Sequence, residues 1–178
     1  MKHQKLFIIL AVFFIAFLVR LSDHPANFSP VLAVALVSSY YFSKKISIGL
    51  LLAVMFVSDI FLGFYDWRLM MVVYSSLAIA GLLGSLLKNN LRFSRVISLS
   101  LIGSIAFFLL TNTAVLAFSS WYPASVSGLL TCFASGLPFF RNTLLGDLFF
   151  SGVFFGLIIA WEKYSLVIKN KVSVISTY

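Results

Sequence analysis

The residues best suited to bind a ligand are five polar side chains in an otherwise apolar sequence: Asp59, Tyr74, Asn112, Arg141 and Asp147. A carboxylate accepts hydrogen bonds or pairs with a cation, and a guanidinium holds an anionic group or an acid. A phenol or an amide orients a ligand through its donors and acceptors. Ionisable groups in a lipid environment are costly, so they are usually paired or functional. These residue types predict a polar binding pocket or a set of internal pairs.

The chain that carries these side chains is strongly apolar. Of its 178 residues, 61% are hydrophobic and 10% are charged, whereas soluble domains carry about 25% charged residues. This composition excludes a disordered chain, a disulfide scaffold and a typical soluble enzyme. The net charge of +8 comes from few acids, because 13 Lys and Arg stand against 5 Asp and Glu. Cys132 is the single cysteine and cannot form an intramolecular disulfide.

Hydropathy predicts an all-α polytopic membrane protein that forms one integral membrane domain over residues 1–178. A membrane-crossing helix needs about 20 mostly apolar residues. The outer connection 119–143 contains a weakly polar stretch that is too short to span, so it is expected to be interfacial or re-entrant, and Pro138 begins the turn into the last span. We expect six transmembrane helices at about 6–21, 28–42, 46–63, 69–87, 96–118 and 144–161.

The distribution of basic residues predicts the orientation of these spans. With the N-terminus inside, the inner segments carry 10 Lys and Arg and the outer segments carry 3. An excess of Lys and Arg marks cytoplasmic loops. We therefore expect both termini in the cytoplasm of a multi-pass cell-membrane protein. Because topology accounts for the positive charge, nucleic acid is not an expected partner.

The N-terminus has a second interpretation as a secretory signal, since a basic start precedes the apolar run Leu6–Val19. Arg20 and Asp23 disfavour this interpretation because they separate the apolar run from any cleavage site, where no A-x-A pattern occurs. Cleavage stays open as an alternative, and the orientation of the other five spans holds in both cases.

In this orientation the five polar residues fall in the outer third of the bundle. They could form a pocket open to the outside, with an Asp59–Arg141 or Asp147–Arg141 ion pair. Alternatively, each caps a helix or lies at the headgroup level, where polarity costs little. Three aromatic residues of the outer loops could form a lid over the pocket or act as anchors at the membrane interface: Trp67, Trp121 and Tyr122.

Small residues at helical spacing predict close helix packing, either within the chain or against a partner protein. Gly152 and Gly156 form a G-x-x-x-G pattern, and such patterns let helix backbones approach closely. The other small residues with this expected role are Gly81, Gly84, Gly49 and Ala53.

Enzyme signatures are absent from the sequence. There is no H-x-x-x-H pattern, cysteine cluster, G-x-S-x-G motif or P-loop, so we expect no metal, no cofactor and no autonomous ATP hydrolysis. An enzyme acting on lipid or peptidoglycan precursors stays open as an alternative that rests only on Asp59, Asp147 and Arg141. The residues favour a binding or structural part of a larger assembly.

Several motifs resemble those of an uncharacterised family of small bacterial six-span membrane proteins. The likeness covers roughly residues 25–156. Its most specific part is the L-P-F-F-R-N-T-L-L-G-D run at 137–147. The other motifs are N-F-S-P-V-L-A-V-A-L at 27–36, S-D-I-F-L-G at 58–63, T-N at 111–112 and W-Y-P at 121–123.

The layout of that family is similar to the substrate-binding S components of energy-coupling-factor (ECF) vitamin importers. This resemblance implies capture of a small vitamin-like molecule from outside, and a transmembrane coupling protein with ATPase subunits as partner. S components typically dock through an A-x-x-x-A pattern on the first helix. Here Ala11 and Ala16 lie five residues apart, so docking would need another surface, such as Gly49/Ala53 or Gly152/Gly156. The alternative function is a non-transporting assembly or scaffold protein of the membrane.

Overall fold

The structure is all-helical over its described part. The computed structural model describes the backbone of residues 2–175 and the side chains of residues 7–79 and 81–165, and this backbone contains no strand. The elements are α1 (Lys2–Leu21), α2 (Val31–Tyr41), α3 (Lys44–Leu62), α4 (Trp67–Leu83), the 3-10 helix η1 (Gly84–Leu87), α5 (Phe93–Phe118) and α6 (Val126–Ile175).

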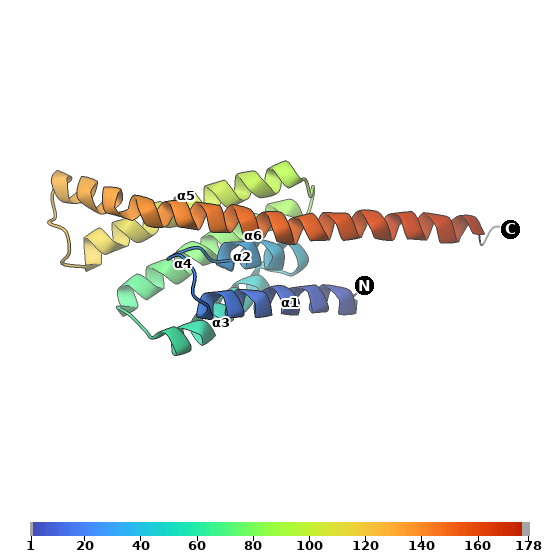
Figure 1. Ribbon diagram of the computed structural model, residues 1–178, viewed down its shortest axis with the longest axis horizontal. Helices are drawn as coiled ribbons and strands as arrows, with labels where there is room; N and C mark the ends of the chain where they lie inside the picture. Colours follow the sequence, from blue (N-terminus) through green and yellow to red (C-terminus); the bar gives the residue numbers. More distant parts are fainter. Residues whose placement is uncertain (1, 176–178) are drawn as a thin grey trace.

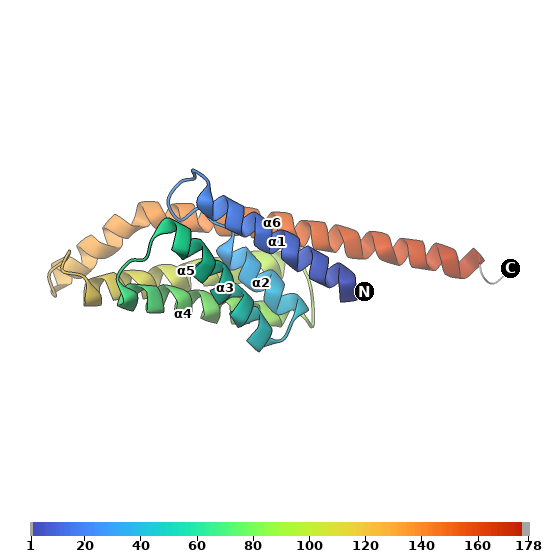
Figure 2. The same ribbon diagram turned by 90° about the horizontal axis from the view of Figure 1, so that it is seen from below.

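Successive helices run in alternating directions along one long axis (Figure 1). The connections 22–30, 63–66 and 119–125 therefore lie toward one end of the molecule, which we call the loop end. The start of α1 and the end of α6 lie toward the opposite end, with the connections 42–43 and 88–92 (Figure 2). This arrangement places the start of α1 and the end of α6 on the same side of the bundle.

Helix α2 is the centre of the bundle. Its residues Val31–Ser39 are all buried, and it contacts α1, α3, α4, η1, α5 and α6. A helix that is apolar all round is expected in a core rather than at a surface. Its 11 residues rise about 16 Å, which is well short of a hydrocarbon core of about 30 Å.

Four helices are long and apolar enough to cross a membrane by length and composition: Lys44–Leu62, Trp67–Leu87, Phe93–Phe118 and Val126–Ser165. Two shorter apolar helices, Phe7–Leu21 and Val31–Tyr41, accompany them. The six helical segments expected from hydropathy are thus present as helices. Among the described residues, four helices are long and apolar enough to cross a membrane, so the expected count of six crossings stays a prediction.

The largest difference from expectation concerns the segment before the last expected span. Residues 126–143 belong to α6, which continues without a break to Ile175 with Pro138 inside it. Pro138 therefore does not turn the chain into a new span. Proline removes one backbone hydrogen bond and crowds the preceding turn, so it bends a helix that continues through it. Figure 2 shows α6 bent in its first third.

The small residues divide into two groups in the structure. Gly81 and Gly84 lie against α2, where a Cβ on Gly84 would lie 2.5 Å from the Leu36 carbonyl oxygen. In contrast, a Cβ on Gly49 or Gly156 would meet nothing within 4 Å, and one on Gly152 would lie 3.8 Å from the Phe93 ring. Ala53 is also exposed. The α4–η1 pattern is therefore used for internal packing, while Gly49 and Gly156 face open space.

Candidate ligand-binding site

A cavity of about 380 Å³ lies among the helices toward the loop end. Its polar lining includes Arg20 from α1, Asn27 and Tyr65 from two connections, and Asp147 from α6. Its apolar walls come mainly from α2, α4 and α5: Val31, Leu32, Leu69, Val73, Leu77, Phe107, Ala114 and Val115. Apolar walls with a few placed polar groups are the usual composition of a small-molecule site.

A second hollow of about 250 Å³ adjoins this cavity. The two share Thr111 and Thr143 in their lining, together with Asn27, Phe107 and Val115. The second hollow extends between α5 and α6 toward Trp121 and Tyr122 in the last connection. Because the two spaces share five lining residues, they form neighbouring parts of one site, with Thr111 and Thr143 at their junction.

One wall of the cavity is held by an ion pair between α1 and α3. Arg20 Nη2 lies 2.6 Å from Asp59 Oδ1, and the exposed fractions of the two side chains are 15% and 4%. Tyr74 donates its hydroxyl hydrogen to Asp59 Oδ2 over 2.6 Å. Arg20 Nη1 also points at the Met55 sulfur at 3.1 Å. The Asp59 carboxylate is therefore fully engaged, with a cation on one oxygen and a phenol on the other.

Tyr65 lies in the connection 63–66 between α3 and α4, and it also lines the cavity. Burial, followed by the nearby negative charge of Asp59, raises the pKa of Tyr65 to about 12. The phenol is therefore protonated at physiological pH and can donate a hydrogen bond.

The opposite wall carries Asp147, whose side chain is buried in α6. The Ser104 hydroxyl on α5 lies 2.7 Å from Asp147 Oδ2 and 2.9 Å from the Ser100 carbonyl oxygen, so these two acceptors share its one hydrogen. Only 4% of Asp147 is exposed, and Ser104 is fully buried. No described Lys, Arg or His forms an ion pair with Asp147. This carboxylate thus differs from Asp59 in having a hydroxyl partner but no cation.

The amide of Asn112 is turned toward its own helix. Asn112 Nδ2 donates to the Phe108 carbonyl oxygen over 2.8 Å, and the Cys132 thiol lies 3.5 Å from the Asn112 carbonyl oxygen. A Cβ on Gly136 would collide with Asn112 Oδ1. Glycine at position 136 therefore lets α6 approach α5 closely enough for the Asn112 side chain to line the second hollow.

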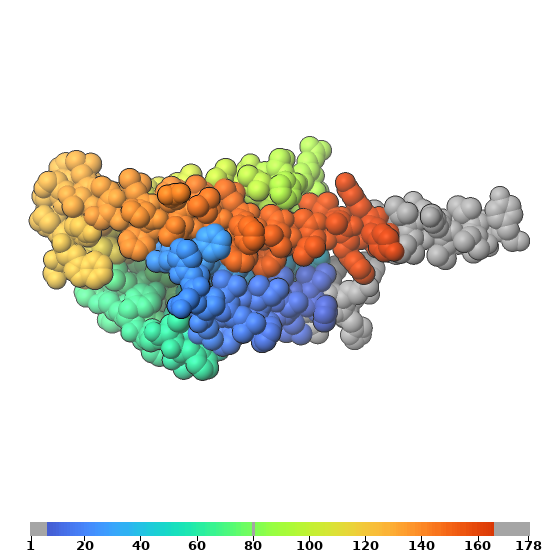
Figure 3. Space-filling model, in the orientation of Figure 1, coloured from blue at the N-terminus to red at the C-terminus, as the bar shows by residue number. Residues whose placement is uncertain are grey.

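The connection 22–30 contributes Asn27 to the lining of both spaces. Asn27 has a φ of 67°, a left-handed conformation that asparagine tolerates better than most residues. Asn142 Nδ2 donates to the Ala26 carbonyl oxygen over 3.0 Å. A Cβ on Gly146 would lie 3.0 Å from the Ser29 nitrogen. Figure 3 shows this connection lying against α6, and the close approach at Gly146 holds it there beside Asp147.

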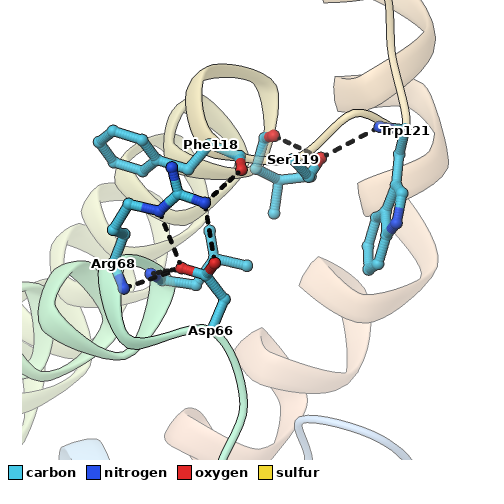
Figure 4. Close-up of polar contacts among 7 residues, drawn as sticks. Asp66, Arg68, Phe118, Ser119 and Trp121 are labelled. Carbon is cyan, nitrogen blue, oxygen red and sulfur yellow. Dashed lines mark hydrogen bonds and ion pairs between the residues drawn. The ribbon is translucent and has the colours of Figure 1, made fainter.

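A separate polar cluster joins the loop end of α4 to α5 (Figure 4). Asp66 caps α4 by accepting from the backbone N–H groups of Arg68 and Leu69. Arg68 pairs with Asp66 at 2.9 Å, and its guanidinium lies 5.6 Å from the Phe118 ring centroid. The side-chain hydrogen bond from Arg68 lowers the pKa of Asp66. This exposed cluster fastens the helix ends and does not line the cavity.

Comparison with known families matches residues 1–168 to a family of unknown function, DUF6580. The chain belongs to DUF6580. No curated protein and no solved structure matches the chain significantly. Membership agrees with the resemblance to an uncharacterised family and brings no assigned activity.

In this DUF6580 protein, the expected site residues fall into three groups. Asp147 lines the main cavity, and Asn112, Trp121 and Tyr122 line the adjoining hollow. Asp59 and Tyr74 line neither space. Asp59 binds Arg20, and Tyr74 donates to Asp59, so together they position the Arg20 side chain. Arg141 and Trp67 are exposed and line neither space.

The expected ion pairs of Arg141 are wrong, since Asp59 pairs with Arg20 and no described acid pairs with Arg141. The physical reason is the continuous α6, which places Arg141 on an exposed helix face instead of in a turn beside the acids. Arg20 lines the cavity, although it is not among the site residues expected from the sequence. The signal that could have identified it was its position as a basic residue at the end of the first apolar run.

Proposed function

We propose that this protein is the membrane-embedded substrate-binding subunit of an ECF-type importer, which captures a small vitamin-like molecule from the outer side. The observation that carries the proposal is the cavity of about 380 Å³ at the loop end. Its polar groups converge from α1, α6 and two connections onto apolar walls, as a small-molecule site requires. The 10 to 3 distribution of basic residues supports an outward-facing loop end.

The opposite half of the bundle supports the same proposal. Leu36, Val37, Val96 and Phe155 are all fully buried there, and the core cluster to which they belong links α1, α2, α5 and α6. A packed inner half closes the site on that side. A molecule that enters from the loop end would therefore need an energised partner to release it inward. A transmembrane coupling protein with ATPase subunits would supply that energy.

The experiment is identification of small molecules that co-purify with the intact protein from cells grown in rich medium. Thr111 stands at the junction of the two hollows, so Thr111→Trp should fill the junction and abolish co-purification. Thr113→Trp is the matched control, because Thr113 is exposed on the same helix. Absence of any co-purified molecule from the wild-type protein, or equal loss in both variants, contradicts the proposal.

The alternative proposal, a membrane assembly or scaffold protein, is favoured by the open space around Gly49 and Gly156. Under this proposal, Gly156→Leu abolishes recovery of a partner in pull-downs while Asn112→Ala has no effect. Under the importer proposal, Asn112→Ala reduces ligand capture. The two substitutions therefore separate the two functions.

A further inference from the structure

The charges around the cavity are unbalanced. Among the described lining residues, Arg20 is the only Lys, Arg or His, and Asp59 already neutralises it at 2.6 Å. Asp147 is the only acid in the part of the lining that the structure describes, and no described cation pairs with it. Once the Arg20–Asp59 pair is counted as neutral, the cavity presents a single carboxylate to whatever occupies it.

The hydrogen bonds of Asp147 leave one of its oxygens available. Oδ2 accepts from Ser104, and no described residue donates to Oδ1. The side chain is 4% exposed and nevertheless belongs to the cavity lining. A buried carboxylate is stable when a cation or several donors compensate its lost hydration. The protein supplies one hydroxyl, so a cationic occupant would supply the compensation that keeps this carboxylate charged.

The walls indicate what else the occupant carries. Val31, Leu32, Val73, Leu77 and Phe107 surround the space, and a volume of about 380 Å³ lies in the range of small organic ligands. A bare metal ion needs several oxygen or nitrogen ligands. No group of three His, Cys, Asp or Glu exists among the described residues. The space fits an apolar body better than an ion alone.

We propose, building on the proposed binding function, that the ligand is a small organic cation: a protonated amine or an amidinium on an apolar or aromatic body. Its charged group pairs with Asp147 Oδ1, and its body lies against Phe107 and the aliphatic walls. Asp147 is then the residue that selects ligands by charge. The Arg20–Asp59–Tyr74 network sets the shape of the opposite wall.

The test uses three probes of matched shape that differ in charge: benzamidine, benzamide and benzoate. Each is titrated against the full-length protein in detergent, and binding is followed by thermal shift and by ligand-observed NMR. We expect benzamidine to bind at least tenfold more tightly than benzamide or benzoate. Asp147→Asn should remove that preference, since the amide keeps the hydrogen bond from Ser104 and loses the charge. Asp147→Glu should restore part of it.

The control is Asp66→Asn, which removes an exposed acid at the same end that lies outside the cavity lining. It should leave the preference for benzamidine unchanged. Equal binding of the three probes, or a preference that survives Asp147→Asn, overturns the inference. Stabilisation by sodium chloride that depends on Asp147, without any effect of benzamidine, also overturns it and indicates an inorganic ion.

Failure of this inference is distinguishable from failure of the proposed function. If a neutral or anionic molecule co-purifies with the wild-type protein and is lost in Thr111→Trp, the binding function stands and the organic-cation inference falls. If no molecule co-purifies, the proposed function itself falls. A co-purified cation whose retention requires Asp147 supports both.

Discussion

Arg20 at the end of α1 and Asp59 near the end of α3 form an ion pair of 2.6 Å across 39 positions of sequence. Tyr74 on α4 completes the arrangement by donating to the second carboxylate oxygen. Three helices are thereby joined at one level, beside the cavity. Because Asp59 is paired in this way, it supports the wall of the site. Asp147 is the lining acid that no described cation pairs with.

The first prediction concerns this pair. Asp59→Asn should lower the free energy of unfolding by about 3 kcal/mol, because it leaves a largely buried guanidinium without a counter-ion. In the double variant with Arg20→Met, much of that loss should be recovered. Chemical unfolding in detergent, arranged as a double-mutant cycle, measures the coupling. Independent, additive effects of the two substitutions would refute the pairing, and the exposed Asp66–Arg68 pair serves as the weakly coupled comparison.

The second prediction tests helix packing at Gly84. Gly84→Ala places a Cβ 2.5 Å from the Leu36 carbonyl oxygen and 2.7 Å from the Leu36 Cα. Backbone atoms of the central helix cannot move aside cheaply, so the substitution should destabilise the protein by about 1–3 kcal/mol. Gly49→Ala is the control, because its Cβ would meet nothing within 4 Å. Thermal unfolding of both variants provides the measurement, and equal melting temperatures would contradict the close packing.

The third prediction is a pH dependence at the cap of α4. The pKa of Asp66 is lowered in the folded protein, chiefly by the hydrogen bond from Arg68. Its stabilising effect is therefore fully present above the ordinary aspartate pKa of about 3.9. The effect is lost as the pH falls through the lower folded value.

Thermal unfolding between pH 6 and pH 3 measures this dependence in the wild type and in Asp66→Asn, which retains a capping side chain. The advantage of the wild type should shrink below about pH 4 and with added salt, because the pair is exposed. A constant difference between the two proteins across this pH range would contradict the prediction.

The fourth prediction tests orientation in intact cells. In a Cys132→Ser background, which removes the single cysteine, cysteine is introduced at Trp121 or at Lys88. Trp121 is 74% exposed in the connection at the loop end, and Lys88 lies in the connection at the opposite end. A membrane-impermeant maleimide should label Trp121→Cys in intact cells and Lys88→Cys only after permeabilisation. The reverse pattern would place the cavity on the cytoplasmic side.

Much of the architecture could be predicted from local sequence, because helices in lipid satisfy their own backbone hydrogen bonds and appear as apolar runs. All six expected segments are helical, and several boundaries lie within a few residues of expectation, as for α3 at Lys44–Leu62 and α5 at Phe93–Phe118. Asp147 lines the main cavity and Asn112 lines the adjoining hollow, and the types and depths of both residues predict a place in a polar lining. Local sequence could not show that α6 continues through Pro138, because proline can either bend a helix or end it. Packing against α5 favours the continuous helix here.

The sequence by itself determined the helical class, the asymmetry of basic charge and the gathering of polar residues toward one end, since each follows from composition along a helix axis. Tertiary structure alone decided which polar groups meet. Arg20 rather than Arg141 reaches Asp59, and Ser104 rather than a cation reaches Asp147. Depth along a helix is encoded by position, but the partner of a side chain depends on helix rotation and on close approach at Gly84, Gly136 and Gly146. These contacts are set by the packing of the whole bundle.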